Sequence, residues 1–245
     1  MMYDKGEWSR MTYTIIVIIK CLSAVLAGIF LGNGAVYFFN KMPAKWLCDY
    51  DQKPSEEMLD NSSQRVKSYP WKVLFTMFFV IIGIKMVMDD PRYAVASLLA
   101  IWTLLEMAIA DKKYMIVPDQ FIILLAVTAL GFIPFHYSWK TCLIGGAIGF
   151  GIMLTVGVMG KLIYKKDALG GGDIKLFASL GLVSGGSGIL AIFIMTTIFS
   201  AGHFIIQLIM KKAKKGDVRP MVPYIMLSAT IYLVFLWGYG DILYF

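Results

Sequence analysis

Long runs of apolar residues, separated by short polar stretches, are the dominant pattern along this chain. A transmembrane helix needs about 20 mostly apolar residues. Seven runs approach or exceed that length, at 13–39, 71–88, 93–110, 121–135, 141–164, 188–210 and 221–239. A shorter run at 174–184 can form one more segment that lies inside the protein. The pattern predicts an all-α, polytopic membrane protein with about eight transmembrane helices, or seven if the short run does not span.

The composition excludes an ordinary soluble domain. Of the residues, 58% are hydrophobic and only 16% are charged, and the mean hydropathy is +0.70, whereas soluble chains carry roughly a quarter charged residues. The one sizeable polar stretch, 40–70, is too poor in apolar residues to form its own core. We therefore expect a single integral membrane domain over 1–245, with 40–70 as a loop within it.

Cysteine and histidine usage gives no sign of a metal centre. Cys21, Cys48 and Cys142 are scattered and form no C-x-x-C pair, so neither a disulfide framework nor a zinc site is predicted. His136 and His203 stand apart from each other in the sequence.

The basic residues predict the orientation in the membrane. Of the 23 Lys and Arg residues, 17 fall in the stretches 41–72, 112–113, 161–175 and 211–219. Basic loops stay cytoplasmic, so both termini are expected outside. We interpret the run "KKAKKGDVR" as a topological anchor rather than a site for nucleic acid or lipid. The first apolar run is too long for a cleaved signal peptide and lacks an A-x-A site, so we expect a retained helix.

Two aspartates stand at the predicted cytoplasmic ends of apolar segments. Asp111 follows "AVASLLAIWTLLEMAIA", and Asp173 precedes "IKLFASLGL", 62 positions later. Ionisable groups near hydrocarbon usually face the protein interior and mark function. Two carboxylates at one depth form a candidate aspartyl dyad, in which one keeps its proton while the other activates water. Alternatively, Asp111 is a solvated helix-end charge.

Three glycines come directly before the second aspartate, in "DALGGGDIKLF". Gly170, Gly171 and Gly172 allow the backbone to approach a neighbouring helix or an extended substrate strand closely. The alternative is a flexible turn in which Asp173 is the N-cap of the next helix.

Several motifs together resemble the type IV prepilin peptidases, which belong to the GxGD intramembrane aspartyl proteases. "ALGGGDIKLFASLG" resembles the GxGD signature, and "ADKKYMIVPDQ" resembles the other aspartate motif, with Asp111 seven positions before Pro118. "GIFLGNGAVYFFNKMP", "SYPWKVLF" and "RPMVPYIMLSATI" are similar to other parts of the family in the same order. The matches span most of the chain.

The resemblance implies a function and a set of site residues. Asp111 and Asp173 would be the catalytic pair of an endopeptidase in the bacterial inner membrane that removes leader peptides from prepilins or pseudopilins at the cytoplasmic face. Gly170, Gly171 and Gly172 would shape the loop, with Lys175 following the catalytic aspartate. Pro118 and Asp119 form the Pro-Asp pair, in which Asp119 is structural or substrate-facing. We expect Glu106 to hydrogen-bond nearby polar groups in a structural role.

The chain departs from many bacterial members in one respect. They carry paired C-x-x-C motifs in the loop after the first helix, whereas 40–70 has only Cys48. The peptidase itself needs no cofactor. Such enzymes also N-methylate the new N-terminus with S-adenosylmethionine, and the altered loop leaves that second activity open for this chain.

Other classes of function stay open on the sequence. A proton- or cation-coupled transporter could use the same two aspartates, although both lie at one face rather than at the midplane and no inverted repeat is visible. A scaffold for pilus assembly without catalysis is disfavoured by the intact motifs. A peptidase for preflagellins fits less well, because the first helix and the loop before Trp71 favour the longer type.

Overall fold

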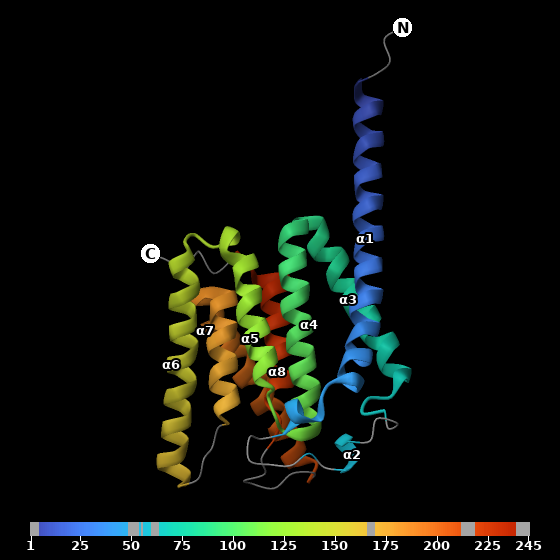
Figure 1. Ribbon diagram of the computed structural model, residues 1–245. Helices are drawn as coiled ribbons and strands as arrows, with labels where there is room; N and C mark the ends of the chain where they lie inside the picture. Colours follow the sequence, from blue (N-terminus) through green and yellow to red (C-terminus); the bar gives the residue numbers. More distant parts are fainter. Residues whose placement is uncertain are drawn as a thin grey trace. The chain divides into compact units, whose positions relative to one another are not determined.

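The computed structural model describes residues 5–48, 54, 56–59, 64–165, 170–211 and 219–238 (Figure 1). Within these residues every regular element is helical, which confirms the predicted all-α class. In chain order the elements are α1 (Lys5–Lys41), η1 (Ala44–Leu47), α2 (Glu56–Leu59), α3 (Ser68–Asp89), α4 (Pro91–Tyr114), α5 (Asp119–Thr128), η2 (Ala129–Phe135), α6 (Trp139–Tyr164), α7 (Gly171–Ile209), α8 (Val222–Ile231) and η3 (Tyr232–Leu236).

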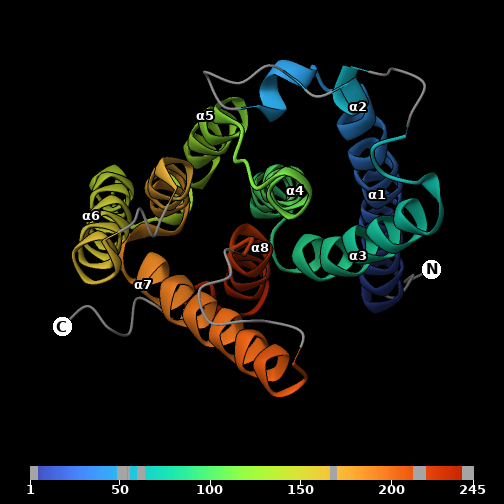
Figure 2. The ribbon, with the colours of Figure 1, turned by 90° about the horizontal axis from the view of Figure 1, so that it is seen from below.

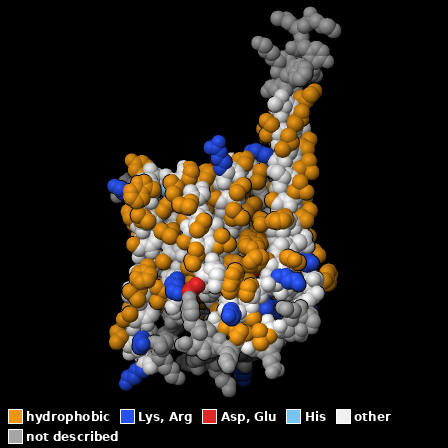
Figure 3. Space-filling model, in the orientation of Figure 1, with side chains coloured by type: hydrophobic (Ala, Val, Ile, Leu, Met, Phe, Trp, Pro, Cys, Tyr) orange, Lys and Arg blue, Asp and Glu red, His pale blue; other side chains and the backbone are white. Residues whose placement is uncertain are grey.

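The chain is a polytopic membrane protein. In its described part, five helices are long and apolar enough to cross a membrane: Arg10–Lys41, Ser68–Asp89, Pro91–Tyr114, Trp139–Ile163 and Gly171–Ile209. Two predicted segments correspond instead to shorter apolar helices, Asp119–Phe135 and Val222–Leu236. Hydrophobic side chains cover most of the helix flanks visible in Figure 3, as expected for surfaces that face lipid.

Helix α7 contains two of the predicted segments. Gly185 interrupts it with φ 72° and ψ −179°, values outside the helical region. A positive φ of this kind is open to glycine at little cost. The break lies between the predicted runs 174–184 and 188–210, and the two legs of α7 run in different directions in Figure 2. The break therefore falls between the two predicted runs, while Gly171–Ile209 counts as one long apolar helix.

The helices divide into two compact units. The first contains Met1–Lys41 and Asn61–Leu98, and the second contains Met42–Asp60 and Leu99–Phe245. In the first unit, α1 packs on α3 through a G-x-x-x-G pair. A Cβ atom on Gly28 would come within 2.5 Å of Val80, and one on Gly32 within 2.4 Å of the Thr76 backbone nitrogen. The absence of side chains at both positions thus permits this close contact.

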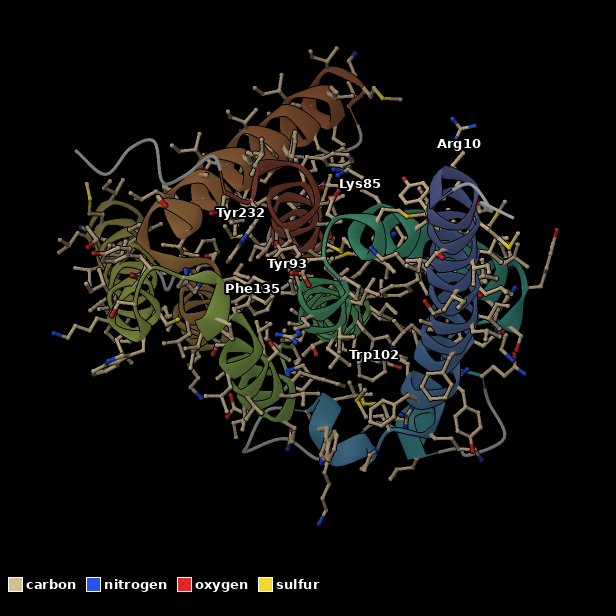
Figure 4. All side chains as sticks on the ribbon, turned by 90° about the horizontal axis from the view of Figure 1, so that it is seen from above. Arg10, Lys85, Tyr93, Trp102, Phe135 and Tyr232 are labelled. Atoms are coloured by element: carbon tan, nitrogen blue, oxygen red, sulfur yellow. The ribbon has the colours of Figure 1, made fainter. Side chains whose placement is uncertain are left out.

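The second unit uses the same kind of contact between α6 and α7. A Cβ atom on Gly145 would lie 2.2 Å from the Gly181 carbonyl oxygen, and one on Gly181 would lie 2.1 Å from the Gly145 carbonyl oxygen. Farther along the chain, Tyr232 points from the end of α8 toward α7 (Figure 4), where its hydroxyl packs at Gly188. The missing side chains of these glycines therefore let α6 and the end of α8 pack closely on α7, the helix whose first turn carries Asp173.

Candidate functional site

The end of α4 and the start of α8 hold the side chain of Asp111. The helix stops three residues later at Tyr114, and Met115 leaves it in a left-handed conformation with φ 58°. Asp111 is only 6% exposed. Its Oδ2 atom accepts a hydrogen bond of 2.8 Å from the backbone N–H of Val222, the first residue of α8, and the backbone of Met221 donates a second. Helix N-termini carry unpaired N–H groups that favour a carboxylate.

The start of α7 holds Asp173. Gly170 is the N-cap residue, with φ −72° and ψ 143°, and Asp173 is the third residue of the helix. The Asp173 N–H donates to the Gly170 carbonyl oxygen at 3.1 Å, and the Gly170 N–H donates to the Asp173 carboxylate. The alternative interpretation of Asp173 as an N-cap is therefore wrong, because a glycine occupies that position.

One cavity of about 750 Å³ brings the two aspartates together. Both line its wall, and their carboxylates lie close enough for a direct electrostatic interaction. The wall contains all the other site residues predicted from the sequence: Pro118, Asp119, Gly170, Gly171, Gly172 and Lys175. Asp167, Ala168 and Leu169 of the glycine motif lie outside the described residues.

Of the three glycines, Gly172 has a packing reason to lack a side chain. A Cβ atom there would come within 3.0 Å of Val117 Cβ, in the connection between α4 and α5. Gly171 has open space around it. The predicted close approach is thus made by Gly172 against the segment that joins α4 to α5. Gly170 and Gly171 have no such close neighbour and leave space at the cavity wall.

An ion pair joins the starts of α5 and α7 at this cavity. Lys175 Nζ lies 3.0 Å from each carboxylate oxygen of Asp119. Pro118 is the N-cap residue of α5, so Asp119 is the first residue of that helix. The Pro-Asp pair and the lysine after the GxGD motif therefore interact directly, 56 positions apart in sequence.

One wall of the cavity was not predicted from the sequence. Lys45, Trp46 and Cys48 line it from η1 and its end, although we predicted only a loop at 40–70. Trp46 contacts Phe121 of α5 edge-on, with ring centroids 6.3 Å apart. The signal that could have indicated this was the pair Trp46–Leu47, which is apolar within a polar stretch.

Glu106 does not make the hydrogen bonds that we expected. It is fully buried in α4, and neither carboxylate oxygen has a hydrogen-bond partner among the described residues. It is absent from the cavity wall. The prediction of hydrogen bonds is therefore wrong for the described residues, and the structural role of Glu106 stays a prediction.

Comparison with known proteins agrees with the motifs. Residues 98–206 match the type IV leader peptidase family, and this range contains Asp111 and Asp173. The prepilin leader peptidase/N-methyltransferase of Pseudomonas aeruginosa is 31% identical over 147 residues, which are 58% of this chain and 49% of that protein. The protein of the same name from Stutzerimonas stutzeri is 30% identical over 145 residues, 58% and 50% of the two chains.

A more distant relative covers more of the chain. The prepilin leader peptidase/N-methyltransferase of Aeromonas hydrophila is 26% identical over 172 residues, 69% of this chain and 58% of that protein. The chain spans about half the length of the first curated relatives that it matches. No solved structure matches it. The segment 98–206 of this chain is thus similar to the type IV leader peptidase family.

Proposed function

We propose that this chain is a membrane aspartic endopeptidase that removes the leader peptide from prepilins or pseudopilins, with Asp111 and Asp173 as its catalytic pair. The observation that carries the proposal is their shared position on one cavity wall, within electrostatic reach of each other. The match to the type IV leader peptidase family supports the reaction, since both aspartates lie in the matched segment. The names of the relatives support the substrate class.

The proposed chemistry uses the two carboxyl groups and one water molecule. Because the side chains interact, they exchange protons as a unit and share one proton between them. The charged carboxylate takes a proton from water as it attacks the scissile peptide carbonyl. The protonated partner polarises that carbonyl and then protonates the leaving amine, each transfer contributing roughly 10²–10⁴ in rate. The backbone contacts of Asp111 and Asp173 supply the fixed orientation that such transfers need.

The cavity wall supports a role for the neighbouring residues in placing a peptide. The exposed backbone at Gly170 and Gly171 leaves space for an extended substrate strand beside Asp173. The ion pair between Lys175 and Asp119 joins the starts of α5 and α7 at the cavity wall. We assign these residues to shaping the site.

We further propose the bacterial inner membrane as the location, with the cavity at the cytoplasmic face and eight membrane segments of the GxGD type. The two legs of α7 supply two of these segments, and the shorter helices Asp119–Phe135 and Val222–Leu236 supply two more. Lys45 and Lys175 on the cavity wall belong to the lysine-rich stretches of the sequence, which supports the orientation.

N-methylation of the new N-terminus is a separate proposal, supported by the names of the relatives alone. S-adenosylmethionine would be the methyl donor. No group of described side chains in the cavity marks a place for its adenosyl part, so we assign no step to it. Mass spectrometry of the processed N-terminus, after incubation with S-adenosylmethionine, tests this activity independently of cleavage.

The test of the peptidase uses conservative variants in membranes with a prepilin substrate. Asp111→Asn and Asp173→Asn should each insert normally and lower the rate of leader removal at least about 10²-fold. Asp89→Asn makes the same chemical change at an exposed end of α3 and should cleave at the normal rate. Cleavage at the normal rate in either cavity variant would remove that residue from the catalytic role.

A transport assay distinguishes the peptidase from a proton- or cation-coupled transporter. If the aspartates relay cations, purified protein in liposomes should move an ion in an Asp111-dependent way and leave prepilin uncut. The position of both aspartates at the ends of their helices favours cleavage over relay across the membrane.

A further inference from the structure

The cavity that holds the two aspartates also has an apolar part of its wall, which the proposed chemistry does not use. Its side chains come from η1 and from the connection between α4 and α5: Trp46, Met115, Ile116 and Val117. All four are at least partly exposed, and Met115 is 45% exposed. Binding sites usually combine apolar side chains, which bury part of the ligand, with a few polar groups that orient it. This cavity has both kinds of wall.

Trp46 is held in place at this wall by its neighbours. Its backbone N–H donates to the Pro43 carbonyl oxygen at 3.0 Å, and the next residue, Leu47, is fully buried. The indole ring lies edge-on to Phe121 of α5, with ring centroids 6.3 Å apart, and Phe121 in turn contacts Trp102 of α4 at 6.4 Å. Edge-to-face pairs of aromatic rings are stabilising. Because the ring is already positioned, little binding free energy is lost to ordering it when a ligand binds.

The size of the cavity limits how much peptide it can hold. Its volume of about 750 Å³ is that of a pocket for a small ligand, for which about 300–1,000 Å³ is typical. A peptide whose scissile bond lies at Asp111 and Asp173 therefore has only its nearest side chains inside the cavity. A side chain that contacts Trp46 in the same cavity belongs to a residue close to that bond.

Selective cleavage requires contacts beyond the two carboxyl groups. These groups act on a peptide carbonyl, which every residue of a chain possesses, so they do not select one bond. In an apolar pocket, one methylene group more or less on the substrate changes the rate by roughly 10- to 200-fold. The wall carries charges of both signs, so charge alone favours neither a basic nor an acidic side chain, whereas Trp46 and Met115 are uncharged.

We propose that Trp46 and Met115 form a subsite for an apolar side chain next to the scissile bond, and that this subsite selects the bond that is cleaved. The inference rests on the proposed peptidase function. A planar indole ring and an unbranched thioether provide an apolar surface that accepts a side chain such as that of leucine. The side chain comes from the last residue of the leader or from the first residue of the mature protein, and the experiment distinguishes the two.

The experiment measures kcat/KM for leader removal by the purified full chain from prepilins that carry leucine or alanine directly before or directly after the cleaved bond. At one of these two positions, the wild-type protein should cleave the leucine form at least about tenfold better than the alanine form. Trp46→Ala and Met115→Gln should each abolish most of this preference, whereas Trp46→Phe keeps an aromatic ring and should retain it. Trp139→Ala makes the same change at an exposed tryptophan that does not line the cavity and should keep the full preference.

A binding measurement separates the subsite from the peptidase function. The Asp173→Asn variant is titrated with the leucine and alanine peptides by calorimetry, and adding Trp46→Ala should remove the tighter binding of the leucine peptide. Failure of the wild type to cleave any prepilin contradicts the peptidase function, and this binding difference then tests the subsite by itself. Cleavage with an equal leucine preference in wild type, Trp46→Ala and Met115→Gln would overturn the subsite and leave the peptidase function standing. A loss confined to substrates with lysine at the same position would also overturn it, because the ring would then bind a cation.

Discussion

Asp111 and Asp173 are held by different parts of the backbone. Asp111 receives N–H groups from the start of α8, more than 100 positions away, whereas Asp173 receives one from the residue that caps its own helix. The local contact of Asp173 is already implied by a glycine-rich helix start. The contact of Asp111 is not, because it depends on how α8 packs.

At the mouth of the cavity, the ion pair between Lys175 and Asp119 should contribute little to stability. The Lys175 side chain is 54% exposed and that of Asp119 is 28% exposed, so solvent screens the pair. Lys175→Gln and Asp119→Asn should each lower the unfolding free energy by less than about 1 kcal/mol. Thermal unfolding in detergent measures this, and the double variant should lose no more than the larger single effect. A coupling well above 1 kcal/mol would contradict it.

Glu106 offers a sharper test at the residue scale. Its carboxylate is fully buried without a hydrogen-bond partner among the described residues, and such a group opposes folding by about 1–3 kcal/mol. Glu106→Met replaces it with an apolar side chain of similar length. We expect the thermal unfolding midpoint to rise and leader cleavage to continue. A stable variant that no longer cleaves would instead place Glu106 in the reaction.

At the scale of elements, the contact between α6 and α7 should be intolerant of a single methyl group. A Cβ atom on Gly181 would lie 2.1 Å from the Gly145 carbonyl oxygen, so Gly181→Ala must push the helices apart. We expect a loss of about 1–3 kcal/mol. Gly202 lies on the same helix with nothing near its Cβ position, so Gly202→Ala should be neutral or stabilising by up to about 1 kcal/mol. Equal unfolding midpoints would contradict this account.

The helices themselves could largely be predicted from the sequence because apolar runs of this length have few alternatives. The break at Gly185 was located to within a few residues, since small residues interrupt the apolar run between 184 and 188. The contribution of η1 to the cavity could not be predicted. It depends on the contact of Trp46 with Phe121, a tertiary interaction that no local periodicity encodes.

The residues of the candidate site could be predicted better than the packing around them. Asp111, Asp173 and the residues beside them occur in local motifs, and all line the same cavity. Glu106 was assigned hydrogen bonds that no described residue makes with it, because a buried carboxylate is normally paired and the sequence does not show which partners are near. Whether the two aspartates catalyse cleavage stays a prediction that the asparagine variants test.

At the scale of the whole molecule, the distribution of lysines predicts which ends of the second unit face the cytoplasm. Gln120 lies on the wall of the large cavity and is exposed, whereas Tyr137 is fully exposed in the connection between η2 and α6. Gln120 lies at the start of α5, and Tyr137 follows the end of η2. The two residues therefore lie at opposite ends of this helical stretch. The positive-inside distribution then assigns Gln120 to the cytoplasm and Tyr137 to the outside.

Cysteine labelling in intact cells tests this orientation. In a background with Cys21, Cys48 and Cys142 replaced by serine, Tyr137→Cys should react with a membrane-impermeant maleimide. Gln120→Cys should react only after the cells are permeabilised, because the bilayer separates it from the reagent. The opposite pattern would place the Asp111–Asp173 cavity on the outer face, where a leader retained in the cytoplasm could not reach it. The labelling therefore decides whether the proposed substrate has physical access to the catalytic pair.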